Sequence, residues 1–478
     1  MRKHPALKYV IGGLAGAALP ALLMTGSAFA DEVDPIQALT ESTNLLWIII
    51  GAVLVIFMQA GFALVETGFT QKKNAAEVMS TNFAIFGLGF VGFLFIGFPL
   101  AFGGFSYPGY FGLNAPMDAH PLIGSGNWAF LWKGWDHLGD AASPALLAFF
   151  LYMVAFMDTT ATIPTGSMAE RWKWKSFVIW GLFCGSIYYP LFAAWTWGGG
   201  WLAKSWDTMG LGAGYVDFAG SGVVHAVGGA AALAGAMVLG PRIGKYGPDG
   251  KARAIPGHNI PMAMLGCFIL LFGWFGFNAA STFASSDIRF ATVATNTAIA
   301  AAVGSVVAMY YITLRKGKPD PGMMVNGMLA GLVAITAPCA FVAPWAAAVI
   351  GALAAIIVIE AVFIIENKGI DDPVGAIAVH GVGGIFGVLC VGLFANGKYG
   401  GAWNGSSVTG VKGLFYGDVG QLGAQALGAV VIMTVIFGFA YGFFKLQNKF
   451  TKGGIRSTEE DEVGGLDIPE MGVAAYTD

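Results

Sequence analysis

The chain has 478 residues, of which 56% are hydrophobic and 11% are charged, and its mean hydropathy is +0.68. Because a typical soluble domain carries about 25% charged residues, this composition excludes an ordinary soluble protein. The formal net charge of −3 offers no basic surface for a phosphate backbone, which excludes nucleic acid as a partner. Glycine contributes 71 residues, about twice its usual share, which favours closely packed membrane helices.

The first thirty residues have the three-part pattern of a secretory signal peptide. Arg2 and Lys3 give a basic start, an apolar stretch follows, and a small-residue triplet ends at Ala30. We therefore predict a cleaved signal peptide over residues 1–30, so that the mature chain begins outside the membrane. The alternative is an uncleaved first membrane helix, but the apolar stretch is short for a span of about 20 residues.

Eleven apolar stretches long enough to cross a bilayer follow, separated by connections rich in Gly, Pro and charge. They predict an all-α membrane domain over residues 31–444. The predicted spans are 44–66, 81–103, 141–166, 176–196, 217–240, 259–280, 291–314, 322–339, 342–365, 373–395 and 418–444.

Lysine and arginine are segregated between alternate connections. With the start outside, the inner connections and the tail hold seventeen of these residues and the outer connections hold five. Because cytoplasmic loops carry an excess of Lys and Arg, eleven crossings with the C-terminus inside are indicated, in a cytoplasmic membrane of bacterial or archaeal type. Residues 445–478 are polar and include the acidic run Glu459–Glu462, which predicts a cytoplasmic tail without its own core.

The sequence gives no sign of redox, metal or enzyme chemistry. The four cysteines lie in or beside apolar stretches without C-x-x-C spacing, so we expect small buried hydrophobes (Cys184, Cys267, Cys339 and Cys390). The chain also lacks a nucleophile elbow, a metal motif and paired acids at an active-site spacing. We therefore expect no catalytic residues, no metal and no cofactor, and an intramembrane enzyme is disfavoured.

Two segments of the chain repeat one another. Residues 217–229 and 372–384 share Asp, Gly, Val, His, Val, Gly and Gly at seven of thirteen positions. These segments open the fifth and tenth predicted spans, and an odd offset of five means that the two units cross the membrane in opposite directions. The pattern is typical of the inverted repeat of a transport protein, here with five helices in each unit.

The repeat places two histidines at the same depth. Each Asp (Asp217, Asp372) suits a helix cap, and each His (His225, His380) lies eight residues further on, about 12 Å from its own face. Because a hydrocarbon slab is about 30 Å thick, both imidazoles should meet near its centre. A mirrored pair at that depth favours a polar path that relays or holds a proton. Packing contacts, or a metal site with these ligands, are the alternatives.

The run Asp217-Phe-Ala-Gly-Ser-Gly-Val-Val-His225 resembles the signature of the ammonium transporter family, the Amt, Mep and Rh proteins. The resemblance covers nearly the whole mature chain and implies a homotrimer in which each protomer of eleven helices carries its own pore for ammonium or ammonia. It also implies a PII-type cytoplasmic regulator as a possible partner. Further matching motifs are Trp197–Gly200, Ala169–Arg171, Gly257–Pro261, Gly273–Ala279, Val379–Gly381 and Gly465–Asp467.

The same resemblance implies roles for individual residues. Trp197 matches the aromatic wall of an outer ammonium site, Ser281 matches its hydrogen-bond acceptor, and Asp217 matches an acid that braces this site. Phe156 and Phe277 match a phenyl gate, and the two histidines match the pair that lines the lumen. Without the resemblance, Trp197 reads as an interfacial anchor and the two Phe residues as packing residues.

One stretch departs from the family pattern. Asp158 follows the gate residue Phe156 where the family usually keeps small or apolar residues, and Tyr152 stands where Phe is frequent. Asp158 either accepts hydrogen bonds from neighbouring hydroxyls near Pro164 or, with Tyr152, forms an additional cation or proton site.

Two functions remain open on the sequence. The first is a transporter that recruits ammonium, deprotonates it and conducts ammonia, with or without a relayed proton. The second is an ammonium sensor that signals through a cytoplasmic partner with little or no transport. Asp158, which the helix length places near mid-membrane, and the altered third span favour it.

Overall fold

The computed structural model describes residues 34–104, 120–134, 138–139 and 142–477. The predicted signal peptide over residues 1–30 lies outside this described part of the chain.

Ten helical segments in the described residues are long and apolar enough to cross a bilayer. The apolar helix α12 (Pro321–Thr336) is shorter than these ten segments, and with it each predicted stretch overlaps an apolar helix. The ten segments are α2 (Pro35–Phe69); η1, α3, η2 and α4 (Lys72–Asn74, Ala75–Gly92, Phe93–Gly97, Phe98–Phe102); α5 (Pro144–Met168); α6, η4 and α7 (Trp174–Phe183, Cys184–Tyr188, Tyr189–Trp195); η5 and α9 (Ser221–Ala226, Val227–Leu239); α10 and η6 (Ile260–Ala279, Ala280–Thr282); α11 (Arg289–Lys316); α13 (Pro344–Asn367); η7 and α14 (Ile377–Val382, Gly383–Phe394); and α15, η10 and α16 (Val419–Val431, Ile432–Ile436, Phe437–Phe450).

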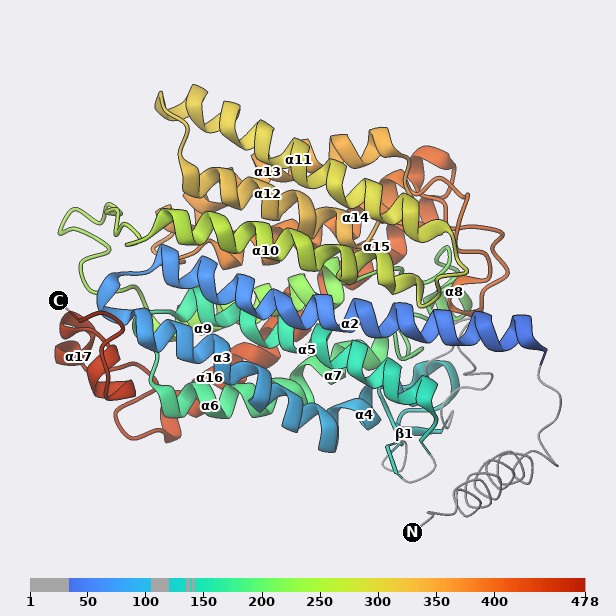
Figure 1. Ribbon diagram of the computed structural model, residues 1–478, viewed down its shortest axis with the longest axis horizontal. Helices are drawn as coiled ribbons and strands as arrows, with labels where there is room; N and C mark the ends of the chain where they lie inside the picture. Colours follow the sequence, from blue (N-terminus) through green and yellow to red (C-terminus); the bar gives the residue numbers. More distant parts are fainter. Residues whose placement is uncertain (1–33, 105–119, 135–137, 140–141, 478) are drawn as a thin grey trace, which may run out of the picture.

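Short elements occupy the two ends of the bundle. The long helices run side by side between these ends, and the C-terminus lies with α17 at one of them, which we call the tail end (Figure 1). The opposite end carries β1 and α8, and we call it the Trp197 end. The short elements are β1 (Pro121–Ile123) and its antiparallel partner β2 (Leu131–Trp132), η3 (Gly126–Trp128), α8 (Ser205–Met209), η8 (Trp403–Gly405), η9 (Leu414–Tyr416), α17 (Glu459–Gly464) and η11 (Asp467–Met471).

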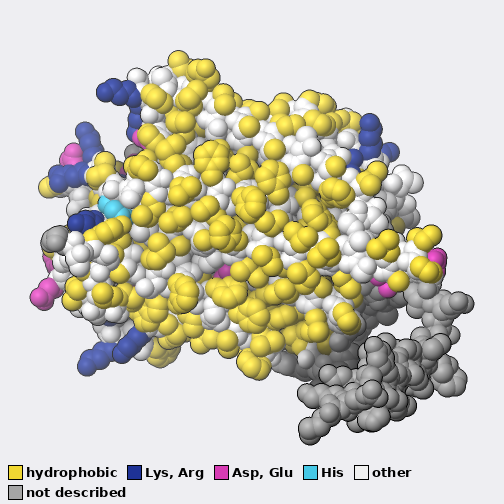
Figure 2. All heavy atoms as spheres, in the orientation of Figure 1, with side chains coloured by type: hydrophobic (Ala, Val, Ile, Leu, Met, Phe, Trp, Pro, Cys, Tyr) yellow, Lys and Arg dark blue, Asp and Glu magenta, His cyan; other side chains and the backbone are white. Residues whose placement is uncertain are grey.

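The surface matches a bilayer. Figure 2 shows apolar side chains across the broad middle of one face and Lys and Arg side chains toward its two ends. Large apolar side chains such as Phe83 and Phe272 are exposed to the surroundings at 84% and 57%. An exposed apolar band of this extent is stable in lipid and not in water.

Local sequence signals explain where several long helices begin. The side chains of Ser143 and Asn259 accept hydrogen bonds from main-chain N–H groups at the starts of α5 and α10. Proline follows each cap within the first two helical positions, where its missing N–H costs nothing. Asp34 and Asp320 cap α2 and α12 in the same way.

The interior is built on close helix contacts. In the most apolar 18-residue stretch of α5, 89% of the residues are buried, so this helix lies inside the bundle and not at its surface. Helices α2 and α10 approach closely at Gly61 and Gly266, where an added Cβ on Gly266 would lie 2.7 Å from the Gly61 carbonyl oxygen. This contact confirms the expectation that glycine serves helix packing. All four cysteines are free and buried, as predicted.

The segment after residue 444, predicted to be a polar tail, begins as helix and then packs against the bundle. Helix α16 continues to Phe450, and the following residues lie against the membrane helices, with Ile455 and Leu466 fully buried. The Asp467 carboxylate accepts a hydrogen bond from the Glu77 main-chain N–H near the start of α3. A segment without its own core is therefore ordered by its contacts with the tail end of the bundle.

Candidate functional site

The two repeated acids cap the two repeated helices, as predicted. The Asp217 carboxylate accepts hydrogen bonds from four main-chain N–H groups of residues 220–223, at 2.7 to 3.1 Å. The Asp372 carboxylate does the same for residues 376–378, at 2.8 to 3.4 Å. Asp217 thereby satisfies four free N–H groups at the start of η5, and Asp372 satisfies three at the start of η7. Each acid lies at the positive end of a helix dipole.

The two histidines meet inside the bundle, which confirms the predicted contact. The Nδ1 atoms of His225 and His380 lie 3.1 Å apart, and both side chains are buried. One nitrogen must donate and the other accept, so that the pair holds a single proton between its rings. The His225 Nε2 atom has no hydrogen-bond partner among the described residues.

Both histidines lie in π-helical segments. His225 belongs to η5 and His380 to η7, and each segment is followed by an α-helix. The helices carrying them touch directly, because a Cβ on Gly229 would lie 2.2 Å from the Gly381 main-chain nitrogen. Glycine at this crossing lets the two imidazoles approach.

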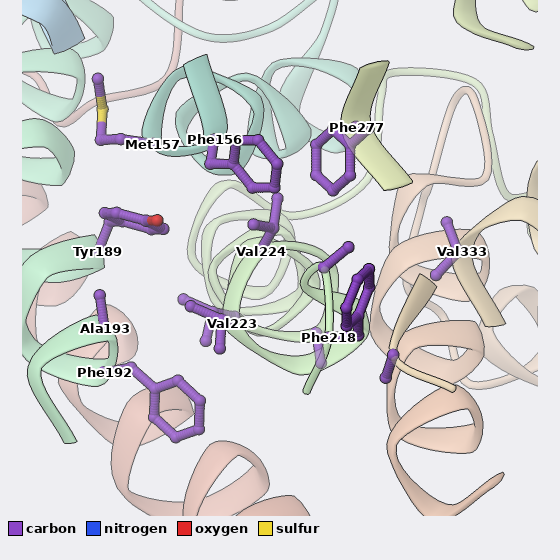
Figure 3. Close-up of a cluster of buried hydrophobic side chains, with 14 of the residues drawn as sticks. Phe156, Met157, Tyr189, Phe192, Ala193, Phe218, Val223, Val224, Phe277 and Val333 are labelled. Atoms are coloured by element: carbon purple, nitrogen blue, oxygen red, sulfur yellow. The ribbon is translucent and has the colours of Figure 1, made fainter. Parts of the chain in front are cut away.

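A line of aromatic rings leads from the Trp197 end to the histidines. The rings of Phe156 (α5) and Phe277 (α10) are stacked with centroids 4.1 Å apart (Figure 3). The Phe277 ring in turn lies 5.4 Å from the His225 ring. This line joins the predicted gate to the predicted pair.

A pocket opens on the Trp197 side of the stacked rings. Its lining includes Trp197, Asp217 and Ser281, which the resemblance grouped as an outer site, and the gate residue Phe156. The Trp197 indole N–H donates a hydrogen bond to the Asp217 main-chain oxygen at 2.7 Å, so Asp217 holds both the indole and the start of η5. The Ser281 hydroxyl donates to the Phe277 carbonyl oxygen at 2.8 Å.

The structure separates Asp158 from Tyr152. The Tyr152 hydroxyl lies 3.1 Å from Ser281 Oγ and donates to the Gly276 or Phe277 carbonyl oxygen, so it supports the Ser281 wall of the pocket at the Trp197 end. Asp158 is 3% exposed, does not line that pocket, and its Oδ1 has no hydrogen-bond partner among the described residues. The predicted bonds from neighbouring hydroxyls are wrong for Oδ1, because Thr159 and Thr160 donate to main-chain oxygens of α5.

Two further residues at the site escaped the sequence analysis. The Trp274 indole lies almost parallel to the His225 ring, with centroids 5.1 Å apart. Glu66 lines a small cavity together with His380, on the other side of the histidine pair from Phe277. Glu66 could have been noticed in the sequence, because it is a charged residue at the very end of the predicted span 44–66.

Buried charges fix the tail end of the same helices. The Arg242 guanidinium forms ion pairs with Glu170, at the end of α5, and with Asp371, beside the cap of η7. Burial disfavours the charge of Asp371, but the hydrogen bonds from Arg242 and the charges of Arg171 and Arg242 outweigh it and lower its pKa to about 2. Arg242 likewise overcomes burial to lower the pKa of Glu170. The cluster therefore stays charged at neutral pH.

Acid should weaken this cluster in a defined range. Because the folded-state pKa of Asp371 is about 2 and its ordinary value is 3.8, its contribution to stability is present above pH 3.8 and is lost as the pH falls toward 2. We expect the unfolding temperature of the wild type to fall more steeply across that range than that of Asp371→Asn. Thermal unfolding of both proteins at several pH values checks this, and parallel curves would contradict it.

The fold and this site define a class of protein. A bundle of apolar helices with a pocket at one end, stacked phenyl rings, and a buried pair of histidines is the arrangement of a membrane transport protein and not of an enzyme. The sequence profile of the Ammonium Transporter Family matches residues 46–476. The chain belongs to the ammonium transporter family.

Relatives and solved structures agree with that assignment. Ammonium transporter Amt2 of Archaeoglobus fulgidus is 42% identical over 473 residues, covering 98% of this chain and 96% of its own length. A solved structure described as a sensor Amt protein is 36% identical, has a TM-score of 0.78 and covers 91% of this chain and 99% of its own. Mep2 of Candida albicans is 28% identical with a TM-score of 0.73, covering 88% of this chain and 87% of its own.

Proposed function

We propose that this ammonium transporter recruits ammonium in the Trp197 pocket, removes a proton at the phenyl rings and conducts ammonia along the two histidines. The observation that carries the proposal is the contact between His225 and His380 behind the stacked Phe156 and Phe277 rings. The face of the indole ring attracts the ammonium cation by a cation–π interaction that is weak enough for the ion to leave again. Beyond the rings, an apolar path strongly disfavours the bare ion, so ammonia crosses and the histidine pair is available to relay the proton.

The topology that supports this proposal has eleven crossings and an inverted repeat of five plus five helices. The two acid caps and the two π-helical histidine segments support equivalence of the repeated units. The segregation of Lys and Arg then places the Trp197 end outside and the tail end in the cytoplasm. A signal peptide over residues 1–30, cleaved before residue 31, belongs to the same topology.

Assembly and regulation complete the proposal. Family membership supports a homotrimer with one pore in each protomer. A PII-type regulator would bind at the tail end, where the inner loops and the docked tail form one surface. Size measurement of the purified protein in detergent tests the trimer, and co-purification with a PII protein tests the partner.

Ammonium pulses applied to purified protein on a solid-supported membrane test the transport mechanism. A sustained current means that charge crosses with the nitrogen, whereas ammonia flux without current means neutral conduction. Binding of ammonium with neither current nor flux would contradict the transport proposal.

Replacing Trp197 should weaken recruitment more than conduction. A cation over an indole face gains about 0.5–2 kcal/mol, so Trp197→Leu should raise the ammonium concentration for half-maximal flux by about 2-fold to 30-fold. Trp345→Leu is the matched control, because Trp345 is 56% exposed at the start of α13 and does not line the pocket. Equal half-saturation in both variants would remove Trp197 from the recruitment site.

One observation favours a second function, the ammonium sensor. Asp158 is a buried acid whose Oδ1 has no partner among the described residues, and a similar solved structure is described as a sensor Amt protein. An acid that retained a cation inside α5 would slow its passage. Asp158→Asn separates the two functions, because a sensor would gain flux on losing this acid and a transporter would not.

A further inference from the structure

Glu66 is a buried acid for which the transport path described above has no use. It lies on α2, within the span Pro35–Phe69, and is 3% exposed. No Lys or Arg pairs with it in the described part of the chain; its partners are Asn82 on α3 and Thr165 on α5. Ionisable groups at such positions are costly and mark ion or proton pathways.

The hydrogen bonds around Glu66 fit both of its protonation states. The Asn82 amide donates to Oε2 at 2.6 Å and to the Val78 carbonyl oxygen at 3.0 Å, so its orientation is fixed. The Thr165 Oγ1 atom lies 2.8 and 2.9 Å from the two carboxyl oxygens of Glu66. It also lies 2.5 Å from the Thr162 carbonyl oxygen, which only accepts.

The Thr165 hydroxyl can donate to only one of its two neighbours, the Thr162 carbonyl oxygen or the Glu66 carboxyl group, at a time. The Thr165 hydroxyl has one hydrogen. When that hydrogen bonds to the Thr162 oxygen, the contact with Glu66 needs a proton on the carboxyl group; when Glu66 is a carboxylate, the hydroxyl turns to it and Asn82 adds a second donor. Glu66 is thus held so that it gains or loses a proton with little more than a hydroxyl rotation.

The position of Glu66 connects it to the histidine pair. Glu66 and His380 line the same small cavity, and every other side chain in that lining is apolar or absent, as in Phe62, Ile163 and Val379. The Phe62 ring, one helical turn before Glu66, lies 6.0 Å from the His380 ring. A molecule that passes His380 toward the tail end therefore meets one ionisable side chain in this cavity, and it is Glu66.

We propose that Glu66 is a proton-exchange site on the tail side of the histidine pair, where ammonia becomes ammonium. The lone pair of ammonia takes the carboxyl proton, so that an N–H bond forms as the O–H bond breaks. Ammonium is then held against the carboxylate, which Asn82 and Thr165 stabilise by charge-assisted hydrogen bonds. Bulk water at the tail end takes up the ammonium and donates a proton to the Glu66 carboxylate, so that the carboxyl group is restored and hydroxide remains in the water. The inference rests on the proposed transport of ammonia past His380.

The isosteric variant Glu66→Gln tests the site. Glutamine retains an acceptor for Asn82 and a donor for Thr165, but it cannot exchange a proton. We expect ammonium-evoked flux to fall about tenfold, below the 10²–10⁴ typical of positioned proton transfer because water partly substitutes. Glu41→Gln is the matched control, since Glu41 lies on the same helix, is exposed and bonds to Gln37. Wild-type flux in folded Glu66→Gln would overturn the proposal.

Infrared difference spectra of the protein in lipid follow the proton without measuring flux. Addition of ammonium should remove a protonated-carboxyl band and create a carboxylate band, in wild type and in Asp158→Asn, but not in Glu66→Gln. If Glu66→Gln does not fold, Thr165→Val should shift the same band by removing one partner. A wild type that transports without any such band overturns the proposal, whereas the band without transport leaves the proton site standing and refutes the transport mechanism.

Discussion

Ammonium-evoked flux should fall to background when His225 and His380 are both replaced by leucine. The variant fills the crossing with apolar side chains of similar size and removes the nitrogens that face one another at 3.1 Å. Neither a proton nor ammonia then finds a polar partner between the phenyl rings and the tail-side cavity. Uptake of methylammonium into cells and current on a solid-supported membrane measure the effect.

The control for that double variant is a histidine outside the path. His258 lies at the tail end, where its ring nitrogens contact the Thr70 carbonyl oxygen and the Tyr476 hydroxyl. His258→Gln should leave flux within about twofold of wild type, because the substitution preserves a polar side chain and is remote from the pair. Undiminished flux in a folded His225→Leu/His380→Leu protein would refute the histidine pathway.

Arg242→Leu should destabilise the folded protein by about 3–5 kcal/mol, the usual cost of breaking a buried ion pair from one side. The substitution leaves the Glu170 and Asp371 carboxylates, each 1% exposed, without the cation that pairs with them. Thermal unfolding in detergent measures the loss. Function should suffer as well, because Asp371 precedes the residue that caps the His380 helix.

An exposed pair provides the comparison. Arg315 and Glu360 also form an ion pair, but their side chains are 40% and 33% exposed. Solvent screens such a pair, so Arg315→Leu should lower the unfolding temperature much less than Arg242→Leu does. Equal losses in the two variants would mean that burial of the Arg242 cluster is not what makes it important.

Much of the fold was predictable from hydropathy alone. Each of the eleven predicted stretches overlaps an apolar helix, and ten of these helices are long enough to cross a bilayer, which demands a long apolar run for each crossing. The start of the first helix was not predictable in this way: the helix begins at Pro35 instead of residue 44, since the largely polar residues 37–43 continue it beyond the apolar region. The end at Phe450 instead of residue 444 has the same cause.

The site was predictable where the repeat constrained it. Counting eight residues from each acid to each histidine was sufficient to bring His225 and His380 together. Partners from other helices were beyond such counting, as with Trp274 on the His225 ring and Thr165 on Glu66. The docking of the tail depends on two isolated apolar residues, Ile455 and Leu466, which carry no periodic signal.

The π-helical turns make the spacing between acid and imidazole a fixed quantity. A π-helical turn holds one residue more than an α-helical turn, so deleting one residue from Ser221–Ala226 or Ile377–Val382 would convert it into an ordinary turn and change the direction of the imidazole within it relative to its capping acid. Both histidines would still be present in the sequence, but the His225 and His380 rings would no longer face one another. The passage therefore depends on the number of residues in these two stretches as well as on the identity of the side chains that they carry.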